Sequence, residues 1–108
     1  MAALTPQAVD RDGLTVAFAA ADGAGDTAPA SDQHVLLVKN GSAGSVTVTL
    51  VTPRDVQGLA VADLAVPVAA GAEAAIRLGP RNVFGDADGV ASWTYSAAAS
   101  VTVAVLLV

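Results

Sequence analysis

The residues that could carry acid–base or nucleophilic chemistry in this 108-residue chain are few. His34 is the only histidine, and it follows Asp32 by two positions, so the pair could in principle orient a general base. The chain has no cysteine, and no serine stands in the setting of a nucleophile elbow. A polar histidine at the start of a strand is the simpler interpretation. The sequence therefore predicts no catalytic residue, no cofactor and no enzyme activity.

Asp86-Ala87-Asp88-Gly89 resembles the middle of a calcium-binding loop. Such a loop needs more oxygen ligands at fixed spacing and a closing glutamate, and neither follows here. Asp22 and Asp26 could join these carboxylates in space, although nothing in the sequence requires it. Aspartate and glycine also supply the geometry of a tight turn. We predict a turn without a required metal, and ion binding by Asp86 and Asp88 stays open at this point.

Trp93 and Tyr95 are two of the four aromatic residues and stand two positions apart. Alternate residues of a strand share a face, so this pair could form a platform on which a sugar stacks. Carbohydrate sites usually use several exposed aromatic residues. We therefore expect these two residues to cap the core or to lie at an interface.

The charge and hydropathy of the chain exclude several classes of partner. Acidic residues outnumber basic ones by ten to five, so the basic footprint of a nucleic-acid-binding protein is missing. The first residues are neither basic nor a long apolar run, so we expect no signal peptide, and no uninterrupted apolar run of ~20 residues that would span a membrane is present in the sequence. Hydrophobic residues make up 54% and charged residues only 14%, which indicates either surface hidden against a partner or a biased composition.

The pattern of apolar residues predicts an all-β protein. Residues 45–52 alternate between valine or leucine and threonine, as in a half-buried strand. The Asn40–Gly44 loop contains turn residues, so we expect 33–40 and 45–52 to form an antiparallel hairpin. Pro67 implies an edge strand or a bulge. We expect strands at 14–19, 33–40, 45–52, 64–69, 73–79, 90–96 and 100–107.

Short strands separated by frequent turns favour a single antiparallel β-sandwich, immunoglobulin-like or jelly-roll-like, with an open barrel as the alternative. Residues 33–108 form the predicted sandwich domain. Residues 1–32 read as an N-terminal arm with one short strand, in which 20–32 is a long exposed loop. The predicted core consists of Val35, Leu37, Val46, Val48, Leu50, Ile76, Leu78, Val101, Val103 and Val105.

Residues 33–108 also resemble a known protein family. The similarity lies in HVLLVKNGSAGSVTVTLVTP, in VADLAVPVAAGAEAAIRLGPRNVFGDADG and in the closing SVTVAVLLV. Its matching elements are Lys39-Asn40-Gly41-Ser42, Thr52-Pro53, Val68-Ala69-Ala70-Gly71 and Ile76-Arg77-Leu78-Gly79-Pro80. These segments are similar to small capsid decoration, or cement, proteins of tailed bacteriophages.

This resemblance implies a structural virion protein on the capsid exterior, made in the host cytoplasm. Its partner would be the major capsid protein, which it would clamp as a homotrimer without an active site. We expect part of the arm to order against capsid protein or a neighbouring subunit. The candidate contact residues are Leu4, Val9, Leu14, Phe18, Arg54 and Arg81. The alternative is an immunoglobulin-like binding or adhesion module of a phage tail or cell surface, which predicts a monomer with an exposed ligand patch.

Overall fold

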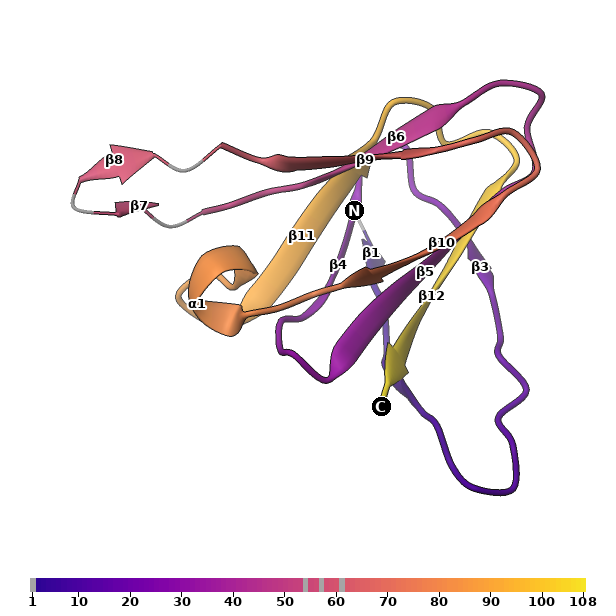
Figure 1. Ribbon diagram of the computed structural model, residues 1–108, viewed down its shortest axis with the longest axis horizontal. Coiled ribbons are helices and arrows are strands. Elements are labelled where there is room, and N and C mark those ends of the chain that lie inside the picture. Colours follow the sequence, from indigo (N-terminus) through magenta and orange to yellow (C-terminus); the bar gives the residue numbers. More distant parts are fainter. Residues whose placement is uncertain (1, 54, 57, 61) are drawn as a thin grey trace.

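Two β-sheets packed face to face make up the body of the protein, and a two-stranded ribbon stands out from them (Figure 1). The computed structural model describes residues 2–53, 55–56, 58–60 and 62–108. The predicted β-sandwich is confirmed, and the described residues form no closed barrel.

Sheet A has the strand order β1 (Ala2–Ala3), β4 (Asp26–Pro29), β11 (Val90–Tyr95), β6 (Val46–Leu50) and β9 (Leu64–Val68). Sheet B has the order β10 (Glu73–Arg77), β5 (His34–Asn40) and β12 (Val101–Leu107), with both β2 (Gln7–Ala8) and β3 (Ala19–Ala20) beside β12. The ribbon consists of β7 (Asp55–Val56) and β8 (Leu59–Ala60), and the one helix of the described residues, α1, spans Arg81–Phe84.

The antiparallel pairs are nested in the sequence. β3 pairs with β12, β4 with β11, β5 with β10 and β6 with β9, as if one long hairpin had been rolled up. The further pairs β5–β12 and β6–β11 then complete each sheet. This nesting is the strand order of a jelly roll rather than of an immunoglobulin domain. The remaining short strands, β1 and β2, pair in parallel with β4 and β12.

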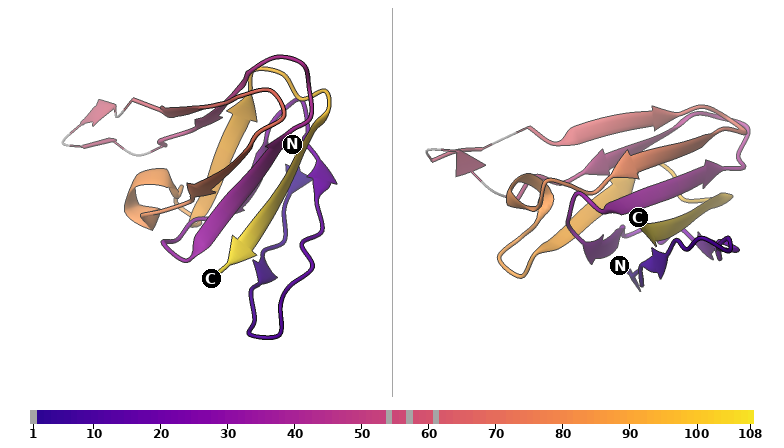
Figure 2. Two further views of the ribbon diagram at one scale, coloured as in Figure 1. Left: turned by 45° about the vertical axis from the view of Figure 1, so that its right-hand side comes forward. Right: turned by 60° about the horizontal axis from the view of Figure 1, so that its bottom comes forward.

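The expected hairpin between 33–40 and 45–52 is wrong, because β5 and β6 lie in different sheets. The loop between them crosses from sheet B to sheet A, as Figure 2 shows at one end of the sandwich. Turn residues allow the chain to change direction, but they do not distinguish a hairpin from a crossing between sheets. The nested pairing decides the matter, since both edges of β5 are taken by β10 and β12.

Asn40 holds this crossing in place. Its side chain is 1% exposed. The Nδ2 group donates to the carbonyl oxygens of Gly44, Val68 and Ala69 at 2.8, 3.0 and 3.3 Å. Oδ1 accepts from the backbone N–H and the hydroxyl of Ser42 at 3.0 and 2.6 Å. One buried amide therefore ties the end of β5 in sheet B to the end of β9 in sheet A.

The strand expected at 14–19 is also wrong, since only 19–20 pair, as β3. Leu14, Val16 and Phe18 are nevertheless half-buried and alternate with exposed neighbours, so burial follows the predicted period without a ladder. The prediction of an exposed loop over 20–32 fails as well, because this segment contains β4. Its residues have weak strand propensity, and their place beside β11 overrides it.

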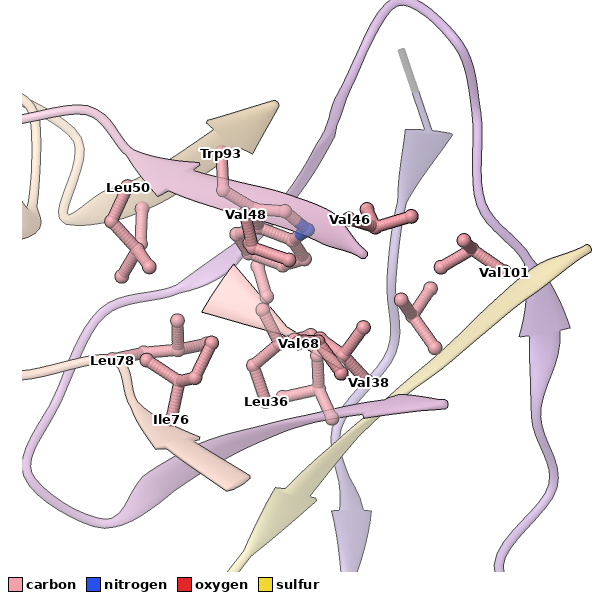
Figure 3. Close-up of a cluster of buried hydrophobic side chains, with 14 of the residues drawn as sticks. Leu36, Val38, Val46, Val48, Leu50, Val68, Ile76, Leu78, Trp93 and Val101 are labelled. Carbon is pink, nitrogen blue, oxygen red and sulfur yellow. The ribbon is translucent and has the colours of Figure 1, made fainter. Parts of the chain in front are cut away.

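The core lies between the sheets, with Trp93 near its middle (Figure 3). Eight of the ten predicted core residues are buried, namely Val46, Val48, Leu50, Ile76, Leu78, Val101, Val103 and Val105. The prediction is wrong for Val35 and Leu37, because Leu36 and Val38 are the fully buried apolar residues of β5. The run of four apolar residues from 35 to 38 offered both faces of the strand, and the period of two could not choose between them.

Candidate interaction site

The predicted contact residues of the N-terminal segment lie along the sandwich rather than in a detached tail. Leu4 donates its N–H to the carbonyl of Thr27 at 2.8 Å and packs against the core. Val9 donates its N–H to the carbonyl of Leu107 at 2.9 Å, and it is 47% exposed. These contacts place Leu4 beside sheet A and Val9 at the end of sheet B.

A side-chain bridge braces the loop between β2 and β3. Gln7 donates from Nε2 to the carbonyl of Ala17 at 2.8 Å, and its Oε1 accepts the Ala17 N–H at 3.0 Å. This amide pairs with the backbone as a neighbouring strand would. The ring of Phe18 then lies against Lys39 of β5, whose Nζ is 4.7 Å from the ring centroid. Phe18 therefore lies against sheet B, and Leu14 lies in the same braced loop.

Arg81 lies far from that loop, in α1 on the other side of the sandwich (Figure 1). Its residue is exposed, and its guanidinium lies against the backbone of Gly89, where an added Cβ would come within 2.4 Å. Arg54 falls outside the described residues. The structure therefore does not join the five predicted contact residues that it describes into one surface.

The ribbon of β7 and β8 is the most prominent projection of the molecule (Figures 1 and 2). Leu59 on this ribbon is 72% exposed, and Leu64, where the chain re-enters sheet A, is 43% exposed. At the base, Asp63 Oδ1 accepts the backbone N–H and the hydroxyl of Thr52 at 2.9 and 3.0 Å. The sequence did not predict this projection, because a leucine such as Leu59 in a turn-rich stretch can equally pack inward.

Exposed large apolar side chains of the described residues therefore gather in two places. Leu59 lies on the ribbon and Leu64 at the start of β9 beside it, whereas Val9 and Val108 lie at the end of sheet B where β2 runs beside β12. Exposing large apolar side chains to water is unfavourable in free energy, and a partner that covers them removes this cost. These two places are the candidate contact surfaces of the protein.

The most buried polar group near the aromatic residues is Asp26, which is 0% exposed. Tyr95 donates its hydroxyl to Asp26 Oδ2 at 2.5 Å, and Trp93 donates Nε1–H to the Tyr95 oxygen at 2.7 Å. Burial raises the pKa of the Tyr95 hydroxyl well above its ordinary value, and the hydrogen bond to Asp26 raises it further. Trp93 is 0% exposed, so this pair is part of the core and offers no stacking platform for a sugar.

The other Asp26 oxygen, Oδ1, is buried without a hydrogen-bond partner among the described residues. Oδ2 accepts a second bond, from the Asp22 N–H at 3.3 Å. The backbone N–H of Ala24 lowers the pKa of the Asp22 carboxyl, whose Oδ1 accepts that bond at 2.9 Å. The carboxylates of Asp22 and Asp26 therefore accept hydrogen bonds from the turn before β4 and from Tyr95.

His34 has Ser31 as its partner, with Nδ1 2.5 Å from the serine hydroxyl. Within the described part of the chain, no hydrogen bond joins it to Asp32. Ser31 also accepts the backbone N–H of Gln33 at 3.1 Å, so this hydroxyl caps the turn that precedes β5. The arrangement is that of a strand-end turn, in line with the simpler interpretation of His34.

Asp86 forms the turn that the sequence indicated. Its Oδ1 accepts the N–H of Asp88 at 2.8 Å and that of Val90 at 3.1 Å, and Gly89 takes a φ of 77°. The described residues contain no group of three or more His, Cys, Asp or Glu side chains placed to hold a metal ion.

An open pocket of about 190 Å³ lies where loops gather at one end of sheet B. It is lined by Lys39, Asn40, Gly41, Gly71, Ala72, Glu73, Ser100 and Thr102. Its two charged residues pair with each other, with Lys39 Nζ 3.5 Å from Glu73. The pocket therefore presents little charge that a ligand could use.

The fold and its surfaces define the class of the protein, a jelly-roll β-sandwich with a projecting apolar ribbon. The chain matches no protein-family model, and neither a curated protein nor a solved structure is similar enough to count as a relative. Within the described residues, no helix has the length and apolarity that crossing a membrane would require.

Proposed function

We propose that this chain is a structural virion protein that binds the outer surface of a phage capsid and stabilises the shell. The observation that carries the proposal is the projecting ribbon of β7 and β8 with Leu59, which is 72% exposed. A rigid sandwich supplies a base from which such a projection reaches a neighbouring subunit. The exposed side chain of Leu59 gains free energy when a partner covers it.

The fold agrees with this proposal by analogy alone. Jelly rolls occur in viral capsid proteins, and also in lectins and in cupins, so the topology permits a virion role without selecting it. Among these roles, the resemblance of residues 33–108 to capsid decoration proteins favours the virion role. It implies the major capsid protein as the partner, the capsid exterior as the location and a homotrimer as the functional oligomer.

Weak contacts suffice for this function. A protein that binds the assembled shell and not its dissociated subunits stabilises the shell by mass action. A trimer that contacts several capsid subunits at once adds avidity without a strong contact at any one of them. The second exposed surface, at Val9 and Val108, would provide another contact on each chain.

The alternative function is a binding or adhesion module of a phage tail or a cell surface. The same ribbon supports it, because an exposed apolar hairpin fits a receptor as well as a capsid. Because the strand order is that of a jelly roll, such a module would not be immunoglobulin-like. A module acts as a monomer and binds without an assembled shell, so the two functions predict different binding partners.

Cosedimentation with the assembled shells of the phage that encodes the protein tests the proposal, with dissociated capsid subunits as the comparison. We expect binding to shells alone, and loss of binding in Leu59→Asp. Thr94→Asp, at an exposed residue of β11, adds the same charge elsewhere and keeps binding. Val9→Asp and Arg81→Glu test the other surfaces. If the unaltered chain does not bind shells, the capsid function is wrong and the adhesion module takes its place.

A further inference from the structure

The outer edge of β10 presents unpaired backbone groups. Antiparallel strands alternate between residues that bond one neighbour and residues that point the other way. The N–H of Leu78 bonds the carbonyl of His34, and the N–H of Asn40 bonds the carbonyl of Ala72, both at 2.9 Å. The even-numbered residues of β10 therefore pair with β5. Glu73, Ala75 and Arg77 point their N–H and C=O groups outward, where no further strand of the described residues continues sheet B.

The edge of sheet A at β9, in contrast, is protected against the addition of another strand. In β6 the odd-numbered residues bond β11, as the 2.9 Å contact from the Ser96 N–H to the Thr47 carbonyl shows. Thr47 is paired in register with Pro67 of β9, so Pro67 occupies an outward position of that edge. Proline has no N–H to offer, which is a common protection against strand addition. The edge of β10 carries no such protection.

The side chains along the β10 edge are complementary to themselves. Glu73, Ala75 and Arg77 are exposed and lie on the outer face of sheet B. If a second β10 runs antiparallel with Ala75 opposite Ala75, each Glu73 faces the partner copy's Arg77. In this register the outward residues of both copies meet, so their backbone groups bond each other as in a normal ladder.

We infer that β10 pairs with β10 of a second copy about a two-fold axis through Ala75, which joins two B sheets into one continuous sheet. Opposite charges directly across a strand pair stabilise it, whereas like charges destabilise it. A two-fold axis through residue 73 instead of Ala75 would place Glu73 opposite Glu73. An axis through residue 77 would place Arg77 opposite Arg77. The charges therefore favour the register that centres on Ala75.

Existing contacts leave both charged residues accessible for this pairing. Glu73 lies 3.5 Å from Lys39, but the two side chains are 64% and 49% exposed, so this ion pair is a weak competitor. No ion pair of Arg77 is present among the described residues. The contact is isologous, because the same strand serves both copies. It does not depend on capsid binding, and within a trimer it would join one trimer to another.

The mass of the purified chain in solution, measured by sedimentation over a wide range of concentrations, tests the pairing. We expect a concentration-dependent species of two copies, or of two trimers. Ala75→Pro removes an outward N–H that has no hydrogen-bond partner among the described residues, and it should abolish that species. Ala65→Pro makes the matched change at an outward position of the β9 edge and should leave the species intact.

Charge reversal provides an independent test of the register. Glu73→Arg alone and Arg77→Glu alone each place like charges across the axis, so either variant should lose the association. The double variant Glu73→Arg with Arg77→Glu restores opposite charges and should restore the association. A chain that never associates, or an oligomer whose mass is unaffected by Ala75→Pro and by the single reversals, would overturn the inference. Circular dichroism of each variant shows that the fold is retained.

Discussion

The hydroxyl of Tyr95 donates a 2.5 Å hydrogen bond to Oδ2 of Asp26, a residue 69 positions earlier in the chain. Asp26 stands directly opposite Trp93 in the pair of β4 and β11, and Trp93 donates its indole N–H to the same hydroxyl. The bond therefore closes a polar cluster of three side chains against the apolar core. It also fastens β4, whose own sequence favours a strand only weakly, to the centre of sheet A.

The titration of Tyr95 should distinguish the folded from the unfolded chain. Burial and the bond to Asp26 raise its pKa above the ordinary value of 10.0, so the hydroxyl stays neutral in the folded state. Its contribution to stability is present below pH 10 and is lost as the pH rises above that value. Tyr95 is the only tyrosine, so tyrosinate absorbance reports on it alone. The signal should rise near pH 10 in urea and only at higher pH, with unfolding, in buffer.

Tyr95→Phe should destabilise the protein by about 1–3 kcal/mol, because it leaves buried groups of Trp93 and Asp26 without their partner. Urea unfolding followed by Trp93 fluorescence measures this change. The control is Thr94→Ala at the exposed neighbouring position, for which we expect a change within about 0.5 kcal/mol. Equal stability of the Phe variant and the unaltered chain would show that the cluster contributes nothing.

Asn40→Ala should lower the free energy of unfolding by about 1–3 kcal/mol, because the carbonyls at the crossing lose a buried donor. Asn40→Asp should cost more, although its shape is nearly the same. A carboxylate cannot donate, and it would bring a negative charge to the carbonyls of Gly44, Val68 and Ala69. Thermal unfolding of the two variants measures the difference. If Asn40→Asp is as stable as the unaltered chain, the amide does not hold the crossing.

Leu36→Ala and Leu37→Ala test which face of β5 is buried. Leu36 is 0% exposed, so its truncation leaves a cavity and should cost about 2–5 kcal/mol. Leu37 is only half-buried on the outer face, and the same truncation should cost much less. Chemical denaturation of the two variants gives both values. If Leu37→Ala loses more stability than Leu36→Ala, the face of β5 that carries Val35 and Leu37 is the buried one.

The candidate surfaces could be predicted from the sequence only in part. Of the predicted contact residues, Val9 is exposed and belongs to one candidate surface, whereas Leu14 and Phe18 are half-buried. The exposure of Leu59 was not predicted, because a leucine in a turn-rich stretch reads equally as a residue that packs inward. Exposure depends on how far the segment between β6 and β9 carries β7 and β8 beyond the core, and no local pattern records that distance.

The sequence by itself determined the class of the fold and most of the strands. Val46, Val48 and Leu50 alternate with threonines, and that period sets both the strand and its buried face. Pro67 indicated an edge, and β9 is an edge of sheet A. These features are local, because the period of a strand and the missing N–H of proline act within a few residues.

Only the tertiary structure decided which strands pair. Turn residues at Asn40–Gly44 permit a hairpin, yet β5 and β6 lie in opposite sheets because both edges of β5 are taken by strands from distant parts of the chain. The choice of Leu36 over Leu37 for the core follows from the same pairing, since both faces of β5 are apolar. Strand pairing is a competition among all edges of the chain at once, so its outcome cannot be read from any one segment.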